Sequence, residues 1–184
     1  MNFKDAQQDL RQSYVGGASG VMISSLVWGM AAIVALLSTE QMSVLSLFLG
    51  GMLIHPLGIV VSKVLKRSGK HQKDNPLARL ALESTFLLFL GLLIAFAVFQ
   101  LRSNWFFPIL LLIIGGRYLL FSTLYGMRIY WLLGMSLALA GIASLYLDLP
   151  FYTGAFLGGG IEMLFAGIIF YLQYSPNNRV EDSF

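Results

Sequence analysis

Long, uninterrupted runs of apolar residues follow one another along almost the whole chain of 184 residues. A helix needs about 20 apolar residues to cross the hydrocarbon core of a bilayer. Six runs reach that length: Tyr14–Leu37, Met42–Leu65, Leu77–Phe99, Trp105–Tyr125, Ile129–Leu147 and Phe151–Tyr174. They are continuous and about twice as long as the alternating strands of a membrane barrel. We therefore predict an all-α integral membrane protein, a bundle of six transmembrane helices in one domain over residues 1–184.

The composition supports a chain that lies in lipid. Hydrophobic residues make up 57% of the sequence and charged residues only 11%, against about 25% in an ordinary soluble domain. This excludes a disordered chain, a nucleic-acid-binding protein and a soluble globular domain. The expected partner is the lipid bilayer, with a second copy of the chain and a small solute as further partners, and no nucleic acid.

Lys and Arg residues set the expected orientation. With six spans, one side of the membrane carries ten of them: Lys4, Arg11, Lys63, Lys66, Arg67, Lys70, Lys73, Arg79, Arg128 and Arg179. The other side carries only Arg102. Since cytoplasmic loops are enriched in Lys and Arg, we predict that both termini are cytoplasmic. Residues 1–13 then form a short cytoplasmic or interfacial segment, residues 66–76 a basic cytoplasmic loop, and residues 175–184 a polar tail.

Aromatic residues cluster where the spans begin and end. Trp105, Phe106, Phe107, Phe151 and Tyr152 suit an aromatic belt at the outer surface, and Tyr130, Trp131 and Tyr174 suit one at the inner surface.

Four ionisable residues lie inside the apolar runs, namely His55, Glu83, Arg117 and Glu162. A charge at the centre of a bilayer costs on the order of 3 kcal/mol on insertion scales, so such groups face protein or water. Stripes of small residues contain two of the four. His55 lies with Gly51, Gly58 and Ser62, and Glu162 lies with Gly154, Gly158 and Ala166. Because small residues let helices approach closely, we expect both side chains to point at another helix.

Arg117 is the sharpest of these features, because a guanidinium stays protonated when it is buried. Glu83 and Glu162 are the only carboxylates at a comparable depth. Two interpretations stay open. Arg117 forms a salt bridge with Glu162 or Glu83 and clips helices together, or it binds an anionic group in a polar pocket that all four residues line. We predict that a salt-bridge contact to one of the glutamates is present.

Motifs for catalysis or metal binding are weak. The chain has no cysteine and two histidines, so we expect no metal, no cofactor and no catalytic residue. Gly17-Ala18-Ser19-Gly20 matches the Gly-x-Ser-Gly string of rhomboid intramembrane proteases. Here it opens the first span instead of lying deep on a later one, and His55 would have to act as its base. Close helix packing explains the string better. His55 precedes Pro56, which is expected to kink its helix.

Three strings resemble an uncharacterised family of small bacterial multi-pass membrane proteins. They are Gly50-Gly51-Met52-Leu53-Ile54-His55-Pro56-Leu57-Gly58, Leu82-Glu83-Ser84-Thr85 and Ile114-Gly115-Gly116-Arg117-Tyr118. The resemblance covers nearly the whole chain and implies a multi-pass protein of the bacterial cytoplasmic membrane. It supplies no known catalytic residues.

Three functions fit the sequence. The first is a transporter or channel for a small, anionic solute, with Arg117, Glu162, Glu83 and His55 as the binding residues. The second is an accessory or structural subunit of a membrane complex. The third is an intramembrane enzyme that acts on a lipid. A hydrated site would favour the first, a dry core of ion pairs the second, and access of lipid to Ser19 or His55 the third.

Overall fold

The computed structural model describes residues 1–175, and in that part of the chain it contains helices and no strands. The helices are α1 (Phe3–Ser13), η1 (Val15–Gly17), α2 (Ala18–Leu37), α3 (Glu40–Val64), α4 (Leu77–Leu101), η2 (Ser103–Trp105), α5 (Phe106–Tyr125), α6 (Ile129–Tyr146) and α7 (Phe151–Tyr174). Six of them, α2 to α7, are long and apolar enough to cross a membrane. The predicted class and all six spans are therefore confirmed, and the protein is a multi-pass membrane protein.

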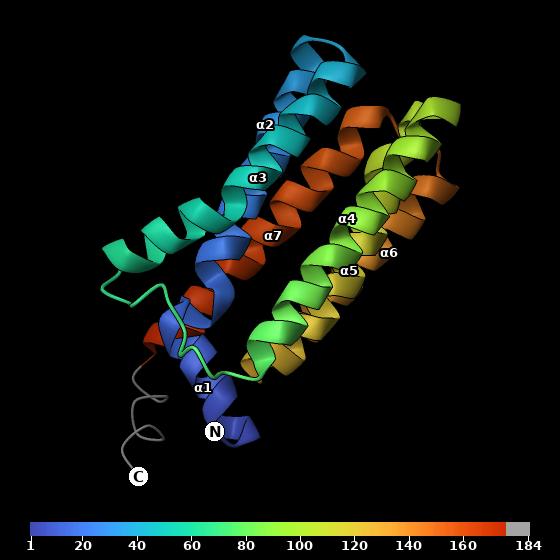
Figure 1. The fold of residues 1–184 in the computed structure, drawn as a ribbon. Helices are drawn as coiled ribbons and strands as arrows, with labels where there is room; N and C mark the ends of the chain where they lie inside the picture. Colours follow the sequence, from blue (N-terminus) through green and yellow to red (C-terminus); the bar gives the residue numbers. More distant parts are fainter. Residues whose placement is uncertain (176–184) are drawn as a thin grey trace.

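The spans form two groups that α7 joins (Figure 1). On one side α3 packs against α2, and on the other α4 and α6 pack against α5. Helix α7 lies between them, mainly on α2 and also against α6 and α5. The consecutive helices α3 and α4 lie in different groups, and the loop over residues 65–76 connects them. Figure 1 shows the amino terminus, this loop and the end of α7 near Tyr174 at one end of the bundle. We call this end the basic end.

Glycines bring the helices of each group close together. A Cβ atom built on Gly115 of α5 would lie 2.7 Å from the carbonyl oxygen of Gly134 on α6. A Cβ atom on Gly159 of α7 would lie 3.1 Å from the carbonyl oxygen of Ser25 on α2. Backbone atoms cannot swing aside as side chains can, so these contacts require residues without a side chain. Small residues at helix contacts are typical of packing in lipid.

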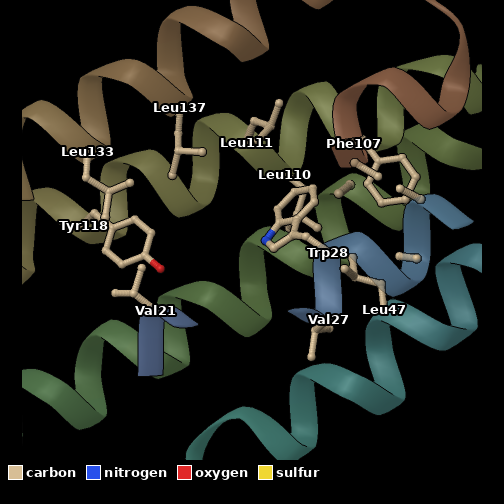
Figure 2. Close-up of a cluster of buried hydrophobic side chains, with 14 of the residues drawn as sticks. Val21, Val27, Trp28, Leu47, Phe107, Leu110, Leu111, Tyr118, Leu133 and Leu137 are labelled. Atoms are coloured by element: carbon tan, nitrogen blue, oxygen red, sulfur yellow. The ribbon is translucent and has the colours of Figure 1, made fainter. Parts of the chain in front are cut away.

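The apolar core lies where α2, α5, α6 and α7 meet. Figure 2 shows part of it, with Trp28 of α2 beside Leu110 of α5, and with Leu133 and Leu137 of α6 near Tyr118 of α5. The Trp28 and Phe107 ring centroids are 5.7 Å apart, and those of Phe107 and Phe151 are 4.7 Å apart. These aromatic contacts hold the end of the bundle opposite the basic end.

The predicted aromatic belts are only partly correct. Tyr152, Trp131 and Tyr174 are exposed, as belt residues should be, and Trp105 is half-buried. The structure buries the other four, which are Phe106, Phe107, Tyr130 and Phe151. Successive residues of a helix point about 100° apart, so a run of adjacent aromatic residues at a helix start must place some of them toward the neighbouring helices.

Helix α1 is a separate element at the basic end. The chain turns between α1 and α2 at Gly16 and Gly17, whose φ angles of 62° and 88° favour glycine. The buried side chains Ala6 and Leu10 pack with Leu77 and Leu124 in a small apolar cluster. Helix α1 therefore packs on the end of the bundle, and the turn at Gly16 and Gly17 separates it from α2.

The basic loop is fastened to α1 by hydrogen bonds. The Asn75 side-chain amide donates to the carbonyl oxygen of Ala6 at 3.0 Å and to the Asp9 carboxylate at 2.7 Å. The Tyr14 hydroxyl lies 2.9 Å from Nδ1 of His71. Burial raises the pKa of Tyr14 above its ordinary value, which favours the neutral hydroxyl that meets His71. These contacts give a charged loop a fixed position against the bundle.

Helix α3 contains Pro56, which has no N–H to donate to the carbonyl oxygen of Met52. The chain stays helical through the proline, but Figure 1 shows the last part of α3 running at an angle to the part before it. This agrees with the predicted kink.

Candidate functional site

Glu162 lies near the middle of α7 and is completely buried. The small residues Gly158 and Gly159 on the preceding turn pack against Trp28 and Ser25 of α2, so this face of α7 points into the protein. The stripe of small residues predicted that orientation, and for Glu162 the structure agrees.

The two oxygens of the Glu162 carboxyl group have different surroundings. Oε1 accepts a hydrogen bond of 2.9 Å from the hydroxyl of Tyr118 on α5. Oε2 is buried and has no hydrogen-bond partner among residues 1–175, although Ser24 of α2 faces the group. An ionised carboxylate accepts several hydrogen bonds, and burying one with a single donor is costly. Glu162 is therefore a buried acidic group that faces Ser24, and its Oε2 has no hydrogen bond of standard geometry among the described residues.

Arg117 precedes Tyr118 on α5 and is half-buried. One terminal nitrogen, Nη2, donates to the hydroxyl oxygen of Thr85 on α4 at 3.2 Å. The central guanidinium carbon lies 5.1 Å from the centroid of the Phe121 ring, within the range of a cation–π contact. The Nε atom is buried and has no hydrogen-bond partner among the described residues. The guanidinium is thus held in place while most of its donors stay unused.

The predicted salt bridge from Arg117 to a glutamate is wrong. Within residues 1–175 the ion pairs are Arg79–Glu83, at 3.0 Å, and Arg102–Asp148, at 2.9 Å. The reason is the direction of the two side chains. Adjacent positions on a helix point about 100° apart, so α5 presents Tyr118 to Glu162 and turns Arg117 toward Thr85. The two charges influence each other only over a longer range.

Glu83 and His55 lie away from these groups. Glu83 is exposed on α4 and pairs with Arg79 one turn earlier on the same helix. His55 is exposed on α3, whereas Gly58 and Ser62 make the buried face of that helix. The structure therefore brings Arg117 and Glu162 into one neighbourhood and leaves the other two predicted binding residues outside it.

Ser19 does not pair with His55. Its hydroxyl lies 2.8 Å from the hydroxyl of Ser62, which in turn donates to the carbonyl oxygen of Gly58. The Gly-x-Ser-Gly string thus serves the contact between α2 and α3, as close helix packing predicted.

The tyrosines around the site were not identified from the sequence. The Tyr118 ring stacks on Tyr130 of α6 at a centroid distance of 5.9 Å, and Tyr130 stacks on Tyr125 at 5.6 Å. The Tyr130 hydroxyl donates to the carbonyl oxygen of Gly16 at 2.6 Å. A signal was available, since a tyrosine well inside an apolar run needs a hydrogen-bond partner for its hydroxyl.

The described residues offer no group of three or more His, Asp or Glu side chains that could hold a metal ion. Two hollows lie elsewhere, one at the basic end beside Arg11, Arg128 and Gln173 and one on the exposed face of α4 beside Glu83. The chemistry that the site offers is therefore the Arg117 guanidinium, with one donor bonded to Thr85, and the Glu162 carboxyl group, with one oxygen bonded to Tyr118.

Comparison with curated proteins and with solved structures found no match. A model of a family of unknown function, DUF7010, matches residues 3–172, nearly the whole chain. The resemblance to an uncharacterised family is thus confirmed, and the chain belongs to DUF7010, a family of unknown function.

Proposed function

We propose that the protein transports a small anionic solute across the bacterial cytoplasmic membrane and that Arg117 binds the solute. One observation carries the proposal. The Arg117 guanidinium lies within a membrane span, forms one hydrogen bond there, and has no carboxylate oxygen of residues 1–175 within 4.0 Å.

The charge of Arg117 needs a partner that the described residues do not supply. Guanidinium keeps its proton even when it is buried, and its five N–H groups suit the oxygens of an anion. Arg117 lies about 12 Å along α5 from the basic end, too deep for bulk water to surround it fully. Thr85 and Phe121 fix its position but bring no negative charge. A bound anion would supply the missing acceptors and the direct ion pair that Glu162, more than 4.0 Å away, does not form.

The two other functions have less support. A structural subunit with a dry core of ion pairs would hold Arg117 against a carboxylate, and the ion pairs found are exposed ones. A lipid-acting enzyme would need an activated nucleophile, and the Ser19 hydroxyl is bonded to Ser62 instead. An accessory subunit stays the alternative that the flux experiment must separate from a transporter.

The test uses the full chain reconstituted in liposomes. Uptake of chloride, nitrate, lactate and phosphate is compared with uptake of potassium and with empty liposomes. Arg117→Gln removes charge-assisted hydrogen bonds worth about 1.5–3 kcal/mol, which corresponds to a roughly ten- to hundredfold loss of anion flux. Arg117→Lys keeps the charge but loses the planar guanidinium group. Its anion flux should therefore lie between that of the parent protein and that of Arg117→Gln.

Arg79→Gln is the matched control, because it removes an arginine that is exposed on α4. We expect it to leave the anion flux unchanged. Flux that is equal in protein-containing and empty liposomes for every tested ion would rule out the transporter and leave the accessory subunit.

A further inference from the structure

In the proposed function Arg117 binds the anion, and the Oε2 atom of Glu162 takes no part. Building on the proposed function, we propose that Glu162 is a proton-binding site and that one proton moves with each monovalent anion bound at Arg117.

Oε2 is the atom to which the proton adds. The Tyr118 hydroxyl occupies Oε1, while Oε2 is buried without a hydrogen-bond partner among the described residues. The step forms one O–H bond, uses a proton from water at the membrane surface and needs no other reactant. Oε1 remains an acceptor in both forms of a carboxyl group, so the hydrogen bond from Tyr118 survives protonation and holds the side chain in one position.

Few other charges act on Glu162. Helix α2, which packs against it, contains no ionisable residue and presents Ser24. Helix α6 contributes Tyr130, whose hydroxyl is bonded to Gly16. The other ionisable residues of α7 are the tyrosines near its two ends.

Helix α5 contributes Tyr118, Tyr125 and Arg117, of which only Arg117 is charged. Arg117 acts on Glu162 over more than the 4.0 Å of a salt bridge. The occupancy of Arg117 therefore controls the charge that Glu162 meets.

The net charge of Arg117, Glu162 and their bound ligands determines which states of the site are favourable inside the membrane. With Arg117 positive and Glu162 ionised, the empty site is neutral. A monovalent anion alone gives a net charge of minus one, and a proton alone gives plus one. Anion and proton together restore neutrality. Because a net charge inside the membrane is costly, the empty and doubly loaded states are the ones that change conformation, and binding of each ligand favours binding of the other.

Coupling is tested in liposomes that enclose a pH-sensitive dye. Chloride, nitrate, lactate and phosphate are added outside in turn, with the membrane potential clamped by potassium and valinomycin. In the parent protein, entry of a transported anion should acidify the lumen. Glu162→Gln fixes the neutral form of the side chain, so the anion-loaded site is neutral but the empty site carries a net charge of plus one. Exchange of internal for external anion should therefore continue, whereas net anion entry and the acidification that accompanies it should be lost. Glu83→Gln, the same change at an exposed carboxylate of a span, should behave as the parent does.

Proton binding is tested separately by infrared difference spectroscopy between acidic and alkaline pH on the reconstituted protein. All nine Asp and Glu side chains can protonate at acidic pH, so the Glu162 signal is the difference between the parent and Glu162→Gln. That difference should contain one carbonyl band of a protonated carboxylic acid, and Glu83→Gln should retain this band. Elution and melting in detergent confirm that each variant is folded. If Glu162→Gln does not fold, acidification by the parent decides the coupling.

The possible failures are distinguishable. Anion flux without acidification in the parent overturns the coupling and leaves the transporter. If Glu162→Gln loses no carboxylic-acid band relative to the parent, Glu162 is not the proton site. No flux of any tested anion overturns the proposed function and the coupling with it, whatever the infrared result.

Discussion

Arg117 and Tyr118 are neighbours in the chain, yet their side chains reach different helices. Arg117 reaches Thr85 on α4, and Tyr118 reaches Glu162 on α7. The depth of each residue in the membrane follows from counting along its helix, and the sequence therefore predicted that Arg117 and Glu162 lie at similar levels. The rotation of one helix relative to another does not follow from such a count, and the predicted salt bridge failed for that reason.

The Tyr118–Glu162 hydrogen bond makes a prediction at this scale. Tyr118→Phe removes the only hydrogen bond to the carboxyl group among the described residues. We expect it to lower the free energy of unfolding by about 1–3 kcal/mol, since a buried polar group is left unsatisfied. Glu162→Leu should also destabilise the protein, because it leaves the Tyr118 hydroxyl without an acceptor.

The double variant tests whether the destabilisation by Tyr118→Phe and that by Glu162→Leu both come from losing the same hydrogen bond. Tyr118→Phe with Glu162→Leu leaves neither partner unpaired, so its destabilisation should be smaller than the sum of the single effects. Unfolding in detergent with increasing dodecyl sulfate measures all three variants. Strictly additive effects would mean that the hydrogen bond contributes nothing to stability.

At the scale of the helices, the sequence predicted the positions of the spans well and the direction of their faces less well. Continuous apolar runs are a strong signal, because a helix satisfies all its backbone hydrogen bonds internally and an apolar sequence is what lets it lie in lipid. The aromatic residues at the helix starts were a weaker signal. Phe106 and Phe151 have the composition of an aromatic belt, but they pack in the core. Which residue of such a run faces lipid depends on the neighbouring helix, which composition does not reveal.

The two glycines Gly115 and Gly116 give a matched test of helix packing. A Cβ atom on Gly115 would lie 2.7 Å from the backbone oxygen of Gly134, whereas one on Gly116 meets only open space. Gly115→Ala should therefore separate α5 from α6 and lower the free energy of unfolding by about 1–3 kcal/mol, the usual cost of overpacking. Gly116→Ala should leave it unchanged or raise it slightly. Equal melting temperatures for the two variants would contradict the close contact between α5 and α6.

At the scale of the molecule, the grouping of the helices was beyond the sequence. In lipid, no hydrophobic driving force selects which apolar helices pair, and contacts between small residues decide instead. Such residues occur on almost every span of this chain. The separation of the consecutive helices α3 and α4 into different groups depends on contacts such as Gly58 with Gly20 and on the long loop over residues 65–76. The sequence does not reveal which glycines meet, and the structure shows that Gly58 meets Gly20.

The orientation of the whole bundle is the last prediction, and it rests on the ten Lys and Arg residues assigned to one side. The chain contains no cysteine, so single cysteines report on their own positions. Ser38 and Gln72 are both exposed and lie in the connections at opposite ends of the bundle. With the basic end in the cytoplasm, Ser38→Cys should react with a membrane-impermeant maleimide in intact cells. Gln72→Cys should react only after the cells are opened. The cysteine-free parent controls for background labelling, and the reverse pattern would place the basic end outside. That result would also reverse the side from which Arg117, about 12 Å from the basic end, receives its anion.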